Sequence, residues 1–279
     1  MKLQKLFIAF ILALFMGSCS YKYENDLISA TKKNDYRSIE HALKHRANVD
    51  TVDEEGFTPL IWASGLGYKN IVKLLLQNRA NITKKNKYGE TALSVASFKG
   101  QDKVAEILIE NKSNVNTVNK DDVTPLMYSA THGFTKIVSL LLKNNANVNA
   151  VSGEGLTPLT YACLGDKYDA AKLLIKYKAD VNFKELGDDA ILLLTAYHGN
   201  TDIAKLLIEN GADVNIWNKN LDTPLMAACR SRNFEMVKLL LESKADMNAK
   251  DENGETALVH AKRTGEKKVI DLLISFGAK

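Results

Sequence analysis

Histidine and carboxylate side chains are the residues of this chain whose types could support metal binding or proton transfer. His41 and His45 lie one helical turn apart and could share a metal ion, and the other histidines are His132, His198 and His260. No acidic or cysteine residue is spaced to complete a site around the first pair. We therefore expect His41 and His45 to lie on a solvated helix face, and we expect no bound metal.

Short motifs that mark catalytic or nucleotide-binding sites do not occur in the sequence. It contains no GxxxxGK(S/T), HExxH, GxSxG or CxxC. Asp188 and Asp189 form a carboxylate pair that could act as general acid and base. They stand directly before a segment that we expect to begin a helix without the usual threonine, so either could cap that helix instead. We favour capping, and we expect neither enzymatic activity nor a cofactor.

Composition and charge are those of a folded chain with no preference for polyanions. Hydrophobic residues make up 46% and charged residues 25%. The formal net charge is +4, and without Lys2 and Lys5 it is +2 (4 − 2). Basic and acidic residues are mixed along the chain, so we expect no nucleic-acid partner.

The first eighteen residues have the pattern of an export signal. Lys2 and Lys5 form a short basic start, and the run from Leu6 to Met16 is apolar without interruption. That run is well short of the roughly 20 residues that a membrane-spanning helix needs, and it matches the core of a signal peptide. We expect residues 1–18 to be a signal peptide.

The residues that follow this run resemble a bacterial lipobox. In Met16-Gly17-Ser18-Cys19 small residues precede a cysteine, although the family usually has leucine in place of Met16. The resemblance implies that Cys19 becomes the first mature residue and carries the lipid. The alternative is an ordinary signal peptide in which Cys19 is incidental. We favour lipidation. Two or more acyl chains on one cysteine would anchor the protein stably, because a single chain binds membranes only marginally. Residues 19–24 would then tether the chain to a membrane of the bacterial cell envelope, on the periplasmic side or at the cell surface.

A repeat of 33 residues occupies the rest of the chain. Thr-Pro-Leu or Thr-Ala-Leu recurs at a fixed spacing of 33 residues, here called the 33-residue ruler, with a degenerate copy at Ala190-Ile191-Leu192. The triplets begin at positions 58, 91, 124, 157, 190, 223 and 256. An alanine or small residue, a turn residue that is mostly glycine, a leucine pair and Ala-Asn-Val-Asn or Ala-Asp-Val-Asn keep the same spacing. One step further back reaches Leu27, so about eight units fit.

The recurring residues resemble the ankyrin repeat, whose pattern is a turn, TPLHxA, a glycine, an apolar helix and GADVN. The resemblance covers residues 25–279. It implies an all-α ankyrin-repeat solenoid of about eight helix-turn-helix units with β-turn fingers. No single unit can bury its apolar helix face alone, so stacked neighbours must supply the core.

Local chemistry supports the same elements. Threonine at the start of the triplet can cap a helix, and proline at the next position loses no hydrogen bond there. The unit that begins at Ala190 lacks both, so we expect its first helix to be the weakest internal one. Before the Ala-Asn or Ala-Asp pair, glycine is kept only at Gly211 and Gly277. In left-handed geometry each substitute costs roughly 1 kcal/mol against glycine. The substitutes are Arg46, Arg79, Lys112, Asn145, Lys178 and Lys244.

Two sets of side chains have a predicted place inside the stack. Cys163 and Cys229 fall at one position two units apart, about 20 Å at the packing distance of helices, which is too far for a disulfide. Trp62, Tyr128 and Tyr161 share the position that resembles the family's inner, packed helix face. We expect both sets to be buried in the core.

The resemblance also implies a surface that binds a partner. In ankyrin-repeat proteins the finger tips and the two residues before the turn between the helices form a concave binding surface. Trp, Tyr and Arg are enriched among binding hot spots, although scattered exposed apolar residues are common on any protein. Those positions hold Phe57, Tyr88, Phe98, Lys99, Val123, His132, Leu156, Leu164, Tyr197, His198, Trp217 and Arg230.

Taken together, the patterns predict a non-catalytic protein-interaction module that is exported and tethered to a membrane. We expect it to be a monomer that binds a protein partner on its concave face. The alternative is a structural or self-associating lipoprotein scaffold of the envelope.

Overall fold

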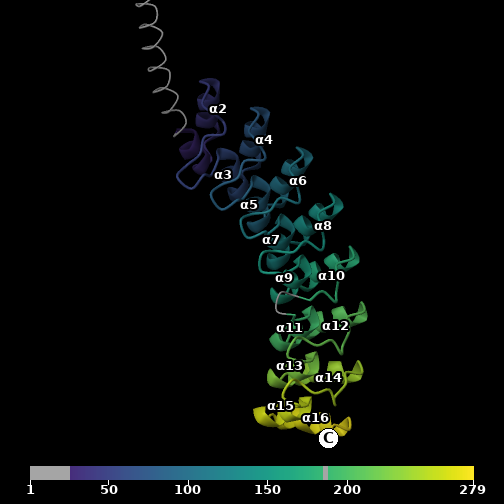
Figure 1. Ribbon diagram of the computed structural model, residues 1–279. Helices are drawn as coiled ribbons and strands as arrows, with labels where there is room; N and C mark the ends of the chain where they lie inside the picture. The colour runs from purple at the N-terminus through teal and green to yellow at the C-terminus, as the bar shows by residue number, and fades with distance from the viewer. Residues whose placement is uncertain (1–25, 185–187) are drawn as a thin grey trace, which may run out of the picture. The chain divides into compact units, whose positions relative to one another are not determined.

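The computed structural model describes residues 26–184 and 188–279, and these residues fold into pairs of short helices joined by loops (Figure 1). Apart from one isolated bridge between Lys184 and Ala190, they contain no β-structure. The all-α prediction is therefore confirmed. The predicted signal peptide, the lipid site Cys19 and the tether lie outside the described residues.

Each repeat contributes two helices. The inner helix starts at the Thr-Pro-Leu triplet, and the outer helix carries the leucine pair. The inner helices are residues 26–32, α3 (Pro59–Leu66), α5 (Ala92–Phe98), α7 (Pro125–His132), α9 (Pro158–Leu164), α11 (Ile191–His198), α13 (Pro224–Arg230) and α15 (Ala257–Thr264). The outer helices are α2 (Tyr36–Lys44), α4 (Lys69–Gln77), α6 (Asp102–Glu110), α8 (Thr135–Lys143), α10 (Tyr168–Lys176), α12 (Thr201–Glu209), α14 (Phe234–Glu242) and α16 (Lys267–Ser275).

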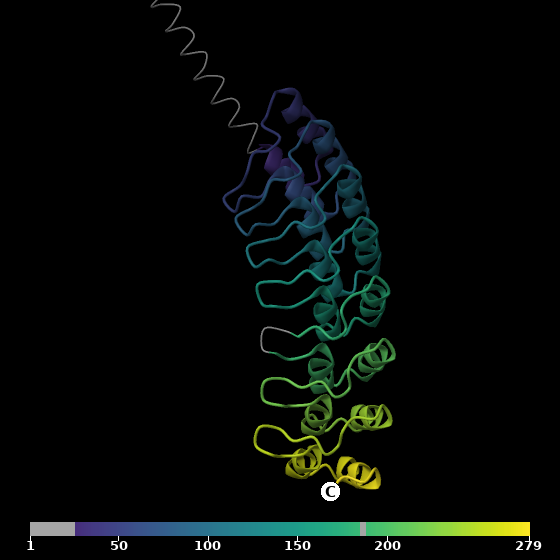
Figure 2. The same ribbon diagram turned by 45° about the vertical axis from the view of Figure 1, so that its right-hand side comes forward.

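The chain divides into two compact units between Pro125 and Leu126. In the first unit α3 packs against α4 and α5, and α4 packs against α6. In the second unit the inner helices α9, α11, α13 and α15 pack one against the next, and so do the outer helices from α8 to α16. The loop before each inner helix, here called the finger, projects to the same side of the helices within each unit (Figure 2).

The core is built from positions that recur every 33 residues. The second member of the leucine pair is completely buried in every outer helix from α4 to α16. These residues are Leu75, Leu108, Leu141, Leu174, Leu207, Leu240 and Leu273. Full burial of a leucine side chain is worth about 1.5–3 kcal/mol, so this row is a main source of stability. The predicted burial of Cys163 and Cys229 is also confirmed.

Threonine side chains begin most of the inner helices. The hydroxyls of Thr58, Thr91, Thr157 and Thr223 accept a hydrogen bond from the backbone N–H three residues later, as the sequence predicted. Thr256 makes no such bond, and its buried hydroxyl has no partner. Side-chain capping therefore contributes to α3, α5, α9 and α13 and not to α15.

Helix α11 has no side-chain cap, and the prediction that Asp188 or Asp189 supplies one is wrong. The N-cap of α11 is Ala190, with no side-chain hydrogen bond. The Asp188 carboxylate lies 3.5 Å from Lys184 Nζ. Asp189 Oδ1 accepts instead from Asn218 Nδ2 of the next finger, at 2.6 Å. The carboxylates are engaged by neighbouring loops and leave the helix end uncapped.

The second residue after each outer helix has left-handed geometry. Arg46, Arg79, Lys112, Asn145, Lys178 and Lys244 have φ between 61° and 69°. Gly211 and Gly277 have φ of 92° and 99° at the same position. A cation at the C-terminal end of a helix recovers part of the strain of a side chain there, typically 0.3–1 kcal/mol.

Neighbouring repeats are also joined by a recurring polar bond outside the core. Asp50 Oδ1 accepts from the backbone N–H of Asn81 at 2.8 Å, across a sequence separation of 31 residues. The same bond runs from Asp180 N to Asn149 Oδ1, from Asp213 N to Asn182 Oδ1 and from Asp246 N to Asn215 Oδ1. The last residue of the Ala-Asn-Val-Asn motif therefore ties its own repeat to the next one.

None of the helices in the described part of the chain is long and apolar enough to cross a membrane.

Candidate protein-binding surface

In five of the fingers one polar side chain organises the loop through two backbone hydrogen bonds. Asn86 Oδ1 accepts from the backbone N–H groups of Tyr88 and Glu90, both at 2.9 Å. The corresponding oxygens of Asp53, Asn119, Asn218 and Asp251 accept the equivalent pair in their own fingers. This position was missed in the sequence, although an Asp or Asn recurs there on the 33-residue ruler. We call it the finger base.

Backbone bonds join neighbouring fingers in each unit. In the first unit the N–H of Lys87 donates to the carbonyl of Glu55 at 3.0 Å, and the N–H of Lys120 donates to that of Tyr88 at 3.1 Å. In the second unit Glu252 donates to Asn220 at 3.0 Å. Gly89 shows how close this approach is, since a Cβ added there would lie 2.9 Å from Lys120 N. Side chains on the fingers are thus presented on a fixed frame.

The first unit holds five of the predicted binding residues. Tyr88 and Phe98 are exposed by 54% and 40%, and the Lys99 ammonium lies 4.9 Å from the Phe98 ring centroid. The Tyr88 hydroxyl donates to Glu55 Oε2 at 3.0 Å, and that bond raises the pKa of the phenol. Phe57 and Val123 are half-buried. Tyr88 and Phe98 are the large apolar groups of this set that remain open to a partner.

The second unit holds the other seven predicted residues, of which Trp217 is described separately. Leu164, Tyr197 and Arg230 end successive inner helices at the same repeat position, and Leu164 and Tyr197 are exposed. Arg230 is half-buried, because its Nη1 donates to Asp222 Oδ1 at 2.6 Å. The Tyr197 ring meets His198 edge to face, with centroids 5.6 Å apart.

The remaining two residues of this set make their own local contacts. His132 is exposed and stacks on Phe134, and its Nδ1 lies 2.9 Å from the carbonyl oxygen of Tyr128. Leu156 is half-buried. We refer to these eleven residues of the two units, without Trp217, as the finger surface.

Trp217 directly precedes the finger base Asn218. Its half-exposed indole lines a hollow with Leu221 and, from the next repeat, Asp246, Ala249 and Lys250. The Lys184 Nζ donates to the carbonyl of Trp217 at 3.0 Å and lies 5.8 Å from its ring centroid.

The inner-helix position of Trp62 has a role that the sequence did not predict. Trp62, Tyr128 and Tyr161 are half-buried, so the prediction that they belong to the core is wrong. The Trp62 Nε1 donates to the finger base Asp53 at 2.8 Å, and the Tyr161 hydroxyl donates to Ser152 at 3.3 Å. These side chains link the inner helix to the base of its own finger.

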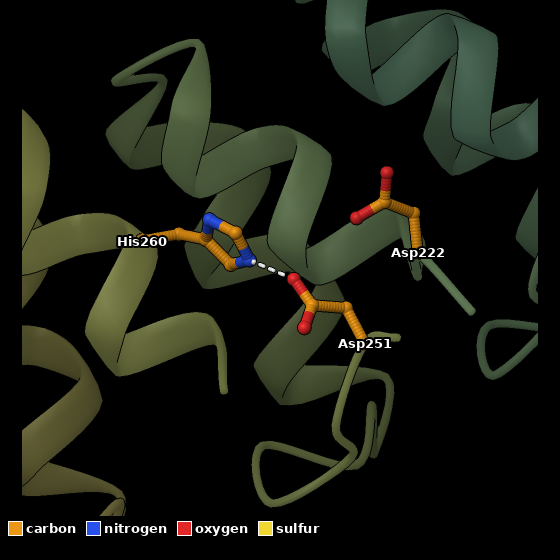
Figure 3. A group of neighbouring side chains, drawn as sticks. All are labelled: Asp222, Asp251 and His260. Carbon is orange, nitrogen blue, oxygen red and sulfur yellow. Dashed lines mark hydrogen bonds and ion pairs between the residues drawn. The ribbon is translucent and has the colours of Figure 1, made fainter. Parts of the chain in front are cut away.

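His260 occupies the same position in α15 and completes the one three-residue cluster in the described residues that could hold a metal ion (Figure 3). His260 Nε2 lies 2.9 Å from Asp251 Oδ2, and both side chains are buried. The ligand atoms of Asp222, Asp251 and His260 lie within 4.8 Å of one another. The sequence did not suggest this cluster, because its residues come from two repeats.

The contacts of this cluster favour a structural link over a metal site. Trp62 Nε1 makes the same bond to Asp53, and an indole N–H cannot bind a metal. Asp222 is paired with Arg230. Burial opposes ionisation of Asp251, but hydrogen bonds from the N–H groups of Glu255 and Asn253 and from His260 outweigh it and lower the pKa of this carboxyl. His41 and His45, the other pair considered, are exposed, and their ring centroids lie 4.2 Å apart.

Comparison with protein families agrees with this architecture. A family model for ankyrin repeats (3 copies) matches residues 27–119, 111–185 and 192–279. The chain therefore belongs to the ankyrin-repeat family, and its repeats indicate a protein–protein interaction module. No curated protein matches the chain.

Proposed function

We propose that the chain is an exported, membrane-tethered interaction module that captures a protein partner on the finger surface. The observation that carries this proposal is the exposure of Tyr88, Phe98 and Tyr197 on a frame that hydrogen bonds hold rigid. Rigid aromatic side chains lose little conformational entropy on binding, and such residues are enriched among hot spots. The ankyrin-repeat family typically provides non-catalytic scaffolds, which is consistent with this role.

The finger surface is tested by a double substitution in the first unit. Tyr88→Ala with Phe98→Ala should weaken partner capture by about 2 kcal/mol or more per residue, the loss typical of buried aromatic anchors. The partner is first identified by pull-down from membrane extract and mass spectrometry, and each variant is then titrated against it. Thermal melting should stay nearly unchanged, because both side chains are exposed.

A matched control removes exposed aromatics from the outer helices. Tyr36 and Tyr168 are exposed by 43% and 40%, close to the exposure of Phe98, and they lie on α2 and α10. Tyr36→Ala with Tyr168→Ala should leave capture unaltered. If this pair abolishes capture and the finger pair does not, the partner binds the outer helices. Self-association in light scattering at rising concentration would favour the scaffold role.

The proposed membrane tether is supported by the pattern around Cys19 and is tested separately. The protein should partition into detergent and incorporate labelled fatty acid, because the thiol of Cys19 is the predicted attachment point. Cys19→Ala should release the protein or leave an unprocessed precursor. Equal labelling of the Cys19→Ala protein would show that the lipid, if any, is attached elsewhere.

A further inference from the structure

The ammonium group of Lys32 lies on the indole face of Trp62 in the first unit. Lys32 Nζ is 4.2 Å from the centroid of the Trp62 ring and 3.2 Å from Asp53 Oδ2. A cation within about 6 Å of a ring centroid is attracted by the negative face of the ring. An indole face and a carboxylate therefore hold the same positive charge from two sides.

The indole of Trp62 and the carboxylate of Asp53 are held in place by other contacts. Trp62 Nε1 donates to Asp53 Oδ2 at 2.8 Å, and the Phe57 ring supports the indole at a centroid distance of 4.9 Å. The other oxygen of Asp53 accepts from the backbone N–H groups of Glu55 and Phe57. Burial opposes ionisation of Asp53, but the bonds from Trp62, Phe57 and Lys32 outweigh it and lower its pKa. The carboxylate is therefore charged at neutral pH in this arrangement.

The Lys32 side chain can move away from the Trp62 ring and the Asp53 carboxylate. Lys32 ends the helical segment 26–32 of the preceding repeat, and its side chain is 41% exposed on a flexible four-carbon stem. Beside it opens a cavity of about 910 Å³, lined by Asp53, Glu54, Glu55 and Trp62 on one side and by Lys32 and Lys33 on the other. A second long side chain can enter this space while Lys32 turns into solvent.

We propose that Trp62, Asp53 and Phe57 form a receptor for a lysine side chain of the partner, and that Lys32 holds this receptor until the partner's ammonium replaces it. The inference rests on the proposed function, since it names the chemistry that the partner presents beside the finger surface. Asp53, Glu54 and Glu55 outnumber Lys32 and Lys33 in the lining of the cavity, and this balance favours a basic segment over an acidic one. The last repeat has a carboxylate at the same position, Asp251, but His260 stands there in place of the indole of Trp62.

The receptor can be tested without the partner, with trilysine peptide as the probe. Trp62 and Trp217 are the two tryptophans of the chain, so Trp217→Phe leaves the Trp62 fluorescence as a direct signal. In that background the Lys32→Ala protein should bind trilysine about 2- to 5-fold more tightly than the parent. The reason is that the Lys32 ammonium no longer competes with the peptide for the Trp62 ring, and an exposed cation–π contact corresponds to about that change in affinity. Lys33→Ala removes the same charge next to the site and should show no comparable gain.

A second substitution separates the receptor from general charge attraction. Asp53→Asn in the Lys32→Ala protein should abolish the gain, whereas Glu54→Gln should reduce it only slightly. Lys32→Met keeps the apolar stem and serves in place of Lys32→Ala if that variant melts early. Equal trilysine binding by the Lys32 and Lys33 variants, or no binding by any variant, overturns the proposal. Because no partner is needed, a failed pull-down leaves this result unaffected.

Discussion

At the scale of single residues, the same repeat position performs one task with different chemistry. The inner-helix side chain that meets the finger base is Trp62, Tyr161 or His260, and its partner is Asp53, Ser152 or Asp251. Each pair brings one N–H or O–H donor to one oxygen. A donor fixed in this way orients the finger against the helix, so the identity of the ring matters less than the position of its polar atom.

The pair in the last repeat makes part of the stability depend on pH. The folded pKa of Asp251 is lowered, so the stabilisation is present above the unfolded pKa of about 4 and is lost as the pH falls through the folded value. Asp251→Asn should therefore lower the melting temperature near neutral pH, and the difference from the parent should shrink toward pH 3. Melting curves of both proteins between pH 3 and 7 measure this. Asp271→Asn, on an exposed side chain, is the control. A difference that stays constant down to pH 3 would contradict the assignment.

At the scale of helices, the inner helices differ in whether a side chain caps their first turn. Four threonines cap their helices, whereas Thr256 and Ala190 do not. The absence of a cap at Ala190 follows from the sequence. The failure at Thr256 does not, since the triplet there is intact. A cap requires the hydroxyl to turn toward the third N–H, and a motif records the residue type and not its rotamer.

The uncapped helix α11 offers a direct gain in stability. Ala190 has extended backbone (φ −82°, ψ 153°) and is buried, as are the capping threonines at the same repeat position. Ala190→Thr should stabilise the protein by about 1 kcal/mol, because its hydroxyl can accept from the N–H three residues later. The urea midpoint measures the change. Thr223→Ala should lose a similar amount, and an unchanged midpoint for Ala190→Thr would show that α11 is held by packing alone.

At the scale of the whole molecule, the stability of each unit is approximately the sum of the stabilities of its repeats and of the contacts between neighbouring repeats. Leu207 on α12 and Leu273 on α16 are both completely buried. α12 packs against outer helices on either side, α10 and α14, while the contacts of α16 are chiefly with α14 and α15. Leu207→Ala should cost about 2–5 kcal/mol.

The same change at Leu273 should have a smaller and more local effect. Leu273→Ala should raise hydrogen exchange in α16 and leave α10 protected. Hydrogen exchange with mass spectrometry on both variants distinguishes the two outcomes. Uniform loss of protection throughout the second unit for Leu273→Ala would contradict nearest-neighbour stability.

The sequence predicted local features of each repeat better than contacts between repeats. The 33-residue spacing predicted the helix pairs and the buried leucines, because each depends on one residue type in one local conformation. It did not predict the cluster of Asp222, Asp251 and His260. That cluster depends on contacts between residues of two repeats, and a one-dimensional period does not carry such contacts.

The bond from Asp50 Oδ1 to the N–H of Asn81, and its copies at Asn149, Asn182 and Asn215, has a consequence for how such a chain can change length. At these four junctions one repeat carries the acceptor and the next repeat carries the donor. Duplication or loss of a whole 33-residue segment of the gene at such a junction therefore leaves the acceptor facing a donor. A duplication of any other length would place unmatched polar groups at the junction. The polar contacts between repeats thus permit the chain to grow or shrink in whole repeats and penalise every other step.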